Sequence, residues 1–93
     1  MATQITQRDN SEEGVTTLQV EGDMLLDDAL LIQRIADSVI AETAHKVVID
    51  LADLDFMDSD AAAILRQLTK NSGVVIEGVE IFLQSAVDMA ERS

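Results

Sequence analysis

Apolar and polar residues alternate over residues 15–21, which is the pattern of a strand with one buried face. Thr16, Leu18 and Val20 fall on the same side of this segment. Gly22 follows directly, and we expect it to end the strand because glycine weakens a strand interior.

Three further segments have the composition of strands. Residues 10–14 have the composition of a turn, so we expect residues 3–7 to form a short edge strand and to make a hairpin with the alternating segment. Residues 47–51 are largely apolar without alternation, which is typical of a central strand covered on both faces. Residues 74–76 predict another strand, which Gly78 ends.

The first segment with helical periodicity follows the alternating strand. Asp27 and Asp28 are expected to open this helix, because carboxylates are favoured at a helix N-terminus. His45 and Lys46 are expected at its end, where cations are favoured. The predicted apolar stripe consists of Leu31, Ile32, Ile35, Ala36, Val39 and Ile40.

A second helix is predicted after the acidic residues that follow the central strand. Asp58 or Ser59 caps its start, and the polar residues 71–73 end it. Its predicted buried face consists of Ala62, Leu65, Leu68 and Thr69. Apolar residues at helical spacing over residues 82–90 predict a last helix.

The resulting order is strand, strand, helix, strand, helix, strand, helix. Alternating strands and helices favour a sheet that is at least partly parallel. We therefore expect a single α/β domain over residues 1–93, with a small mixed sheet of about four strands and about three helices.

The charge of the chain excludes several classes of partner. Six Lys and Arg against 18 Asp and Glu give a net charge of -12. Nucleic acid requires a basic footprint or stacking aromatic residues, and the chain has two Phe and no Tyr or Trp. Anionic membrane surfaces are disfavoured and no apolar run is long enough to span a bilayer. We expect a cytoplasmic protein, consistent with the absence of Cys, whose natural partner is a basic protein surface. The simpler interpretation of the acidity is that it keeps a small protein soluble.

Residues 47–68 carry the motif with the most specific chemical meaning. An apolar strand leads into an acidic loop, and Asp58-Ser59-Asp60 precedes a helical pattern. A serine at a helix N-terminus faces unpaired N–H groups and the positive end of the helix dipole, where a phosphate is tolerated. Ser59 is therefore a candidate phosphoacceptor, and its simpler alternative role is that of a helix cap.

The strand, the acidic loop and the sequence FMDS at residues 56–59 together resemble the STAS domain of bacterial anti-sigma factor antagonists. The sequence VEGDM at residues 20–24 is similar to the family's turn after its second strand. The resemblance implies a single STAS-like domain. It also implies that Ser59 is the serine that a partner kinase, which is itself the anti-sigma factor, phosphorylates.

The chain departs from the family pattern close to this serine. Asp60 and Ala61 stand where the family usually has a second Ser or Thr and then Gly, and Leu25 stands where an Asp is usual. A carboxylate beside a phosphate repels it. Asp60 therefore favours a poorer phosphoacceptor, or a protein biased toward its phosphorylated-like state.

Four further residues are expected to contact the partner: Asp23, Met57, Asp58 and Asp60. Three of them also have a simpler role. Asp23 has the role of a turn residue, Asp58 that of a helix cap, and Met57 that of a packing residue.

The function implied by the resemblance is that of a regulatory binding module, without enzymatic activity, metal or cofactor. It would bind an anti-sigma switch kinase and be controlled by phosphorylation of Ser59. The alternative is a constitutive STAS scaffold subunit of a lipid-transport or stress-sensing complex, which binds its partner through the same surface without a phosphate cycle.

Three other interpretations of the polar residues are disfavoured. A receiver-like phosphoacceptor at Asp50 would require paired acids directly after the first strand, and later Thr and Lys positions that are missing. An EF-hand loop starting at Asp53 would require Gly and Glu where Asp58 and Ile64 stand. The single histidine, His45, has no Ser or Cys partner in an evident motif.

Overall fold

The structure, a computed structural model, describes residues 3–78 as a five-stranded mixed sheet with two helices. The expected α/β class is confirmed, with one strand more than predicted. The helix expected at residues 82–90 lies outside the described residues.

The first two strands form the predicted hairpin, and both are longer than expected. β1 (Gln4–Asn10) pairs antiparallel with β2 (Val15–Met24). Gly22 does not end the second strand as we expected. It has a φ of 87°, the ladder is irregular between it and Asp23, and β2 continues to Met24. Because glycine adopts a left-handed conformation at no steric cost, it bends this strand rather than ending it.

The apolar strand predicted to be central occupies that position. β3 (Lys46–Asp50) lies parallel between β2 and β5 (Val75–Glu77), and its three apolar residues are buried. β5 ends before Gly78, as predicted. A Cβ at Gly78 would lie 2.6 Å from the backbone nitrogen of Ala52, and its φ is 76°, so the close approach of the two segments requires glycine.

The strand that we did not predict lies in the acidic segment that we expected to be a loop. β4 (Leu54–Met57) pairs parallel with the last three residues of β2, Gly22 to Met24, and the irregularity between Gly22 and Asp23 lies within this pairing. This pairing requires β2 to continue past Gly22, and no local pattern in the sequence reveals that continuation.

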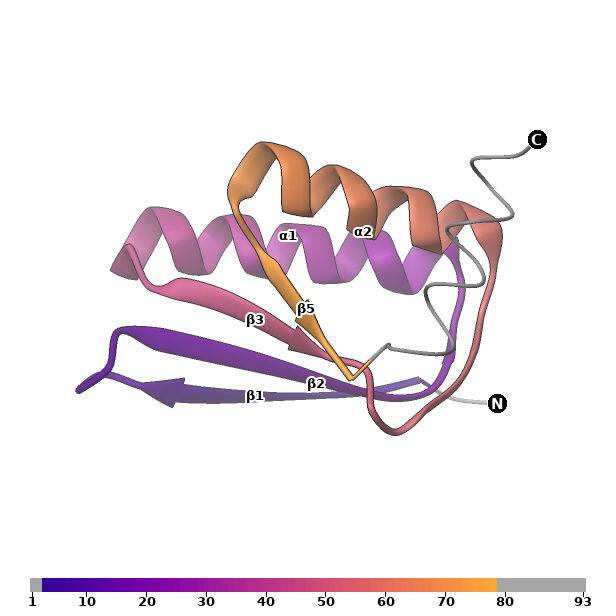
Figure 1. The fold of residues 1–93 in the computed structure, drawn as a ribbon, viewed down its shortest axis with the longest axis horizontal. Coiled ribbons are helices and arrows are strands. Elements are labelled where there is room, and N and C mark those ends of the chain that lie inside the picture. Colours follow the sequence, from indigo (N-terminus) through magenta and orange to yellow (C-terminus); the bar gives the residue numbers. More distant parts are fainter. Residues whose placement is uncertain (1–2, 79–93) are drawn as a thin grey trace.

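The two helices lie side by side on the same face of the sheet and begin at the same end of it (Figure 1). α1 (Leu26–Thr43) begins one residue before the expected Asp27. α2 (Ser59–Ser72) begins at Ser59 and is capped by Asp58. No helix among residues 3–78 combines the length and apolar character needed to span a membrane.

The end of α1 differs from the prediction. We expected His45 and Lys46 in its last turn, but the helix ends at Thr43, and Ala44 follows in the left-handed conformation with a φ of 59°. Lys46 is instead the first residue of β3. The last turn of α1 therefore contains no basic residue, and the negative end of its dipole lacks the expected cation.

The core lies between the sheet and the two helices. Leu18 and Val20 of β2, Ile49 of β3 and Leu65 of α2 are fully buried. Two residues of the predicted apolar faces lie outside it: Leu31 is 45 % exposed, and Thr69 is exposed. Ala29 of α1, which the predicted stripe omitted, is fully buried together with the predicted Ala36, and these small side chains let the helix pack closely against its neighbours.

Candidate functional site

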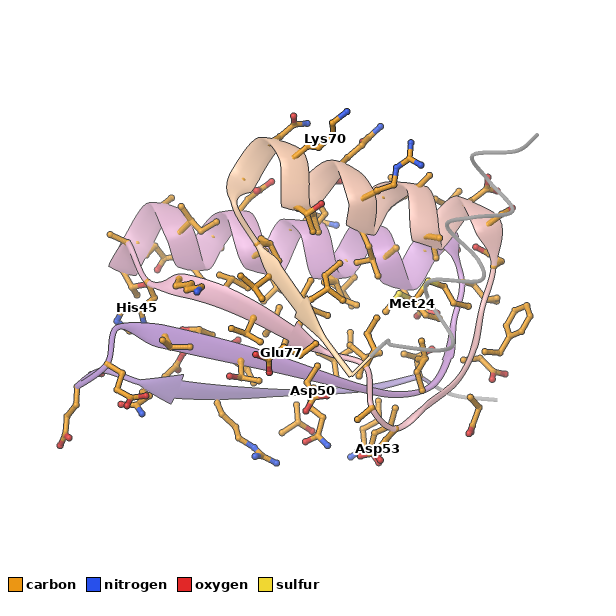
Figure 2. All side chains as sticks on the ribbon, viewed as in Figure 1. Met24, His45, Asp50, Asp53, Lys70 and Glu77 are labelled. Atoms are coloured by element: carbon orange, nitrogen blue, oxygen red, sulfur yellow. The ribbon has the colours of Figure 1, made fainter. Side chains whose placement is uncertain are left out.

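The candidate site is the end of the molecule at which both helices begin. Met24 at the end of β2 is paired with Met57 at the end of β4, and the Asp58 amide donates to the Met24 carbonyl oxygen at 3.1 Å. Because the two strands end side by side, the two helices that follow them also begin side by side (Figures 1 and 2). Segments 33 residues apart in sequence thus form one surface.

Asp58 fixes the start of α2. Its Oδ1 accepts from the Ala61 amide at 2.8 Å, and its carbonyl oxygen accepts from the Ala62 amide at 3.1 Å. The capping alternative for Asp58 is therefore confirmed, and Ser59 is not the cap.

Ser59 is the first residue of α2 and is exposed. Within residues 3–78 its hydroxyl makes no hydrogen bond, and no group accepts from the amides of Ser59 or Asp60. The hydroxyl therefore lies at the positive end of the helix dipole beside two free N–H donors. This is the geometry that the sequence predicted for a phosphoacceptor, and the phosphorylation itself stays a prediction.

The start of α1 is held by a second carboxylate. Asp28 Oδ2 accepts from the Leu25 amide at 3.0 Å and lies 2.9 Å from the Thr3 hydroxyl. The same hydroxyl is within hydrogen-bonding reach of the Asp23 carbonyl oxygen. These contacts tie the residue that precedes β1 to the connection between β2 and α1.

Five carboxylates therefore surround the two helix starts. They belong to Asp23, Asp27, Asp28, Asp58 and Asp60. Both helix dipoles direct their positive ends toward these groups, which offsets part of their mutual repulsion. The structure places Asp23, Asp58 and Asp60 at one end of the molecule, as predicted, and their contact with a partner stays a prediction.

Two exposed apolar side chains lie in the same region. Phe56 of β4 is 47 % exposed, and Leu25, the residue before α1, is 48 % exposed. Met57, which we expected either to contact the partner or to pack, is only 5 % exposed and lies in the core, so its packing role is confirmed. Phe56 and Met57 are consecutive residues of β4, and consecutive residues of a strand point to opposite faces. Met57 therefore points into the core and Phe56 points to the surface.

Sequence reasoning missed Phe56 and Leu25 as surface residues. The available signal was their position, since each is a large apolar residue next to aspartates in a chain with two Phe. An exposed apolar pair rimmed by charged groups is typical of a protein-binding surface.

Asp50, the last residue of β3, and Asp53 of the β3–β4 connection both act as hydrogen-bond acceptors. Asp50 Oδ1 accepts from the Ala52 amide at 3.0 Å, and Asp53 Oδ2 accepts from the Gln19 side chain at 3.0 Å. No group of three potential metal ligands converges anywhere in residues 3–78.

Comparison with known proteins shows the family and the fold. The model of the STAS domain family matches residues 7–91. No curated protein sequence matches the chain significantly. An uncharacterized protein of the DUF3478 family from Shewanella loihica PV-4, with a SpoIIAA-like fold, has a TM-score of 0.62 and 19% identity over 97% of this chain and 77% of that chain. The anti-sigma factor antagonist SpoIIAA in its unphosphorylated form has a TM-score of 0.54 and 14% identity over 97% of this chain and 98% of that chain. At these identities the likeness to solved structures concerns the fold alone.

Proposed function

The chain belongs to the STAS domain family, and on that premise we propose that it is a regulatory protein-binding module rather than an enzyme. Its binding surface is the end at which α1 and α2 begin. The observation that carries the proposal is the exposed Ser59 hydroxyl, which makes no hydrogen bond within residues 3–78 and lies at a helix start that Asp58 caps.

The apolar pair on this surface gives a partner its anchor. Burial of Leu25 and Phe56 removes apolar area from water, which is the main favourable contribution to protein association. The surrounding aspartates select a partner with basic residues around an apolar pocket. Since a similar fold belongs to an anti-sigma factor antagonist, the partner that we propose is an anti-sigma factor with serine kinase activity.

Phosphorylation of Ser59 is the proposed off signal. A phosphate adds a charge of about −1.5 to −2 at neutral pH. It would stand beside Asp58 and Asp60, on a surface that already carries five carboxylates. A partner that also binds the phosphates of ATP near its contact surface would then be repelled, and a phosphatase would restore binding.

The first experiment asks whether Ser59 accepts phosphate. The protein is incubated with its cognate kinase and ATP, and the modified residue is identified by peptide mass mapping. We expect one phosphate on Ser59, none on Ser59→Ala, and unchanged labelling of Ser72→Ala, which alters a serine at the opposite end of the same helix. Phosphate on another residue, or on none, would refute the switch.

The second experiment asks whether the apolar pair is the anchor. Phe56→Ala should weaken partner binding at least about tenfold, because truncating a central aromatic anchor typically costs about 2 kcal/mol or more. Leu30→Ala is the matched control, since Leu30 is 38 % exposed but lies about one turn inside α1 rather than at its start. Equal losses in the two variants, measured by calorimetry, would place the interface elsewhere.

A second candidate function is a constitutive scaffold subunit, for example in a lipid-transport or stress-sensing complex. The position of Asp60 next to Ser59 favours it, because a neighbouring carboxylate opposes a phosphate there. In this case Ser59→Ala leaves both partner binding and cellular output unchanged, while Phe56→Ala still weakens binding.

A further inference from the structure

One edge of the sheet is formed by β1, the outer strand of the β1–β2 hairpin. β1 is the terminal strand in the order β1-β2-β3-β5, and within residues 3–78 its single strand partner is β2. Its seven residues pair with β2 without interruption, so the outward-facing backbone groups form a regular row. Such an edge is a template for an added strand.

A cavity of about 620 Å³ lies between this edge strand and α1. From the strand side it is lined by Gln7 and Asp9 of β1 and by Ser11 of the turn. From the helix side it is lined by residues between Leu31 and Thr43. These spans correspond to roughly 13 Å along a strand and roughly 18 Å along a helix. The cavity is therefore elongated parallel to β1, and a segment of four or five extended residues matches its length.

One wall of this cavity is apolar. Ile35 and Val39 of α1 are partly buried against the core, and Leu31 beside them is 45 % exposed. These three residues recur at helical spacing and form a stripe that faces the side of β1.

The end of the cavity near the C-terminus of α1 is negatively charged. Asp9 and Glu42 both line it, and α1 ends there without a basic residue in its last turn. The carbonyl end of the helix dipole adds partial negative charge to the two carboxylates. Arg34 lines the cavity nearer to Leu31 and is separated along the helix from Glu42.

The acidic end is held in place by a buried hydroxyl. Thr16, which is fully buried, donates to Asp9 Oδ1 at 2.8 Å and lies 3.1 Å from His45 Nδ1. Since a hydroxyl has one proton and gives it to Asp9, Nδ1 of His45 is the donor in the second contact. The hydrogen bonds from Thr16 and then from Gln7 lower the pKa of Asp9 below its ordinary value of 3.8, so this carboxylate stays ionised. His45 lies at the end of the sheet opposite Met24 (Figure 2).

We propose that β1 and α1 form a second binding surface, which accepts an extended segment of a partner protein as an additional strand beside β1. The face of that segment toward α1 carries apolar side chains against Leu31 and Ile35, and a Lys or Arg side chain near Asp9 and Glu42. Backbone hydrogen bonds supply part of the affinity and the alternate side chains supply the specificity.

A second copy of this chain is a poor occupant of the same surface. Each copy has a net charge of -12, and pairing of two β1 strands would bring the carboxylates of both hairpins together. The charge of the cavity therefore favours a basic segment over self-association.

The test uses the full chain and a defined peptide. The probe is an eight-residue peptide of sequence TITVTKTK. A second peptide with the reversed sequence tests the opposite strand direction. We expect binding by fluorescence anisotropy, and slower hydrogen exchange at alternate β1 amides, namely those not bonded to β2. Protection of other segments, or no binding by either peptide, would overturn the proposal.

Backbone methylation separates strand addition from simple charge attraction. Two further peptides carry N-methyl groups on alternate residues in the two possible phases, with the same side chains and charge. One phase should abolish binding and the other should preserve it, since only alternate N–H groups of an added strand face β1. Equal affinity of the two methylated peptides would contradict strand addition.

Charge variants locate the basic side chain. Glu42→Lys should weaken peptide binding at least about tenfold, whereas Asp37→Lys, the same charge change at an exposed position of α1 outside the cavity, should change it much less. If the β1 amides become protected when the protein is concentrated without peptide, a second copy is the occupant and the basic-segment proposal fails.

Discussion

The two ends of α1 carry the same kind of charge in opposite electrostatic settings. At its start, Asp27 and Asp28 stand at the positive end of the helix dipole, and Asp28 also accepts the Leu25 amide. At its end, Glu42 stands at the negative end without a basic neighbour in the last turn. α2 is balanced at both ends, with Asp60 in its first turn and Lys70 in its last. The uncompensated end of α1 is therefore the exception among the four helix ends of residues 3–78.

This difference teaches that net charge alone does not identify a binding surface. The acidic groups at the helix starts have structural roles, since they cap helices and complement dipoles. At the cavity, Asp9 and Glu42 instead lie near the negative end of the α1 dipole, and the last turn of α1 has no basic residue to offset their charge. An acidic protein can thus present two surfaces with different preferences, one arranged around a serine hydroxyl and one arranged to receive a cation.

The largest expected effect is at the start of α2. Asp58→Ala removes the side-chain bond to the Ala61 amide and should lower the free energy of unfolding by about 1 kcal/mol. Asp60→Ala, which removes a first-turn charge that caps no amide in the described chain, should cost about half as much or less. Urea titration followed by circular dichroism measures both, and equal losses would mean that the cap bond contributes nothing beyond charge.

Removing a carboxylate charge should change the stability of the protein in opposite directions at the two ends of α1. Glu42→Gln removes a negative charge at the helix C-terminus and should stabilise the protein by about 0.5 kcal/mol. Asp27→Asn removes the same charge at the N-terminus and should destabilise it by about 0.5 kcal/mol. Thermal unfolding at low ionic strength distinguishes them, and the contrast should shrink in high salt. Melting temperatures that shift in the same direction in both variants would refute the assignment of these effects to the helix dipole.

The smallest effect concerns one carboxyl group in the cavity. Thr16→Val removes the hydroxyl that bonds Asp9 and should raise the pKa of Asp9 toward 3.8, as followed by carboxyl NMR signals. Because the pKa is lowered in the folded protein, this bond stabilises the fold above pH 3.8, and that contribution is lost as the pH falls through the lowered pKa. Wild-type and variant stabilities should therefore converge in acid.

Thr17→Val is the control for this measurement. Thr17 is the next residue of β2, points to the other face, and makes no side-chain hydrogen bond within residues 3–78. Its substitution should leave the pKa of Asp9 unchanged. An equal rise in both variants would attribute the effect to strand packing rather than to the Thr16 hydroxyl.

Much of the fold was predictable because local patterns and burial agree. The alternation of β2, the apolar run of β3 and the helix start at Asp58 each appear in the sequence as they do in the structure. β4 was missed because it is short, follows acidic residues and is stabilised by pairing with β2 rather than by its own pattern.

The candidate site was predictable in part for the same reason. Ser59 stands directly after a capping residue, and that relation is local. The exposure of Phe56 and Leu25, and the burial of Met57, depend on which face of β4 meets the core and on where α1 begins. Both are decided by contacts between segments that are distant in sequence.

The class of the fold, the central strand and a helix that begins at Asp58 or Ser59 all follow from the sequence, since each rests on local periodicity and on the chemistry of helix ends. The choice of Asp58 as the cap, rather than Ser59, comes from the structure. Only the tertiary structure decided that β2 continues past Gly22 and pairs with β4, which brings the two helix starts together. It also placed Asp9, Thr16 and His45 in one hydrogen-bonded group beside an open edge strand. These outcomes depend on pairing and packing over long sequence separations, which no window of neighbouring residues encodes.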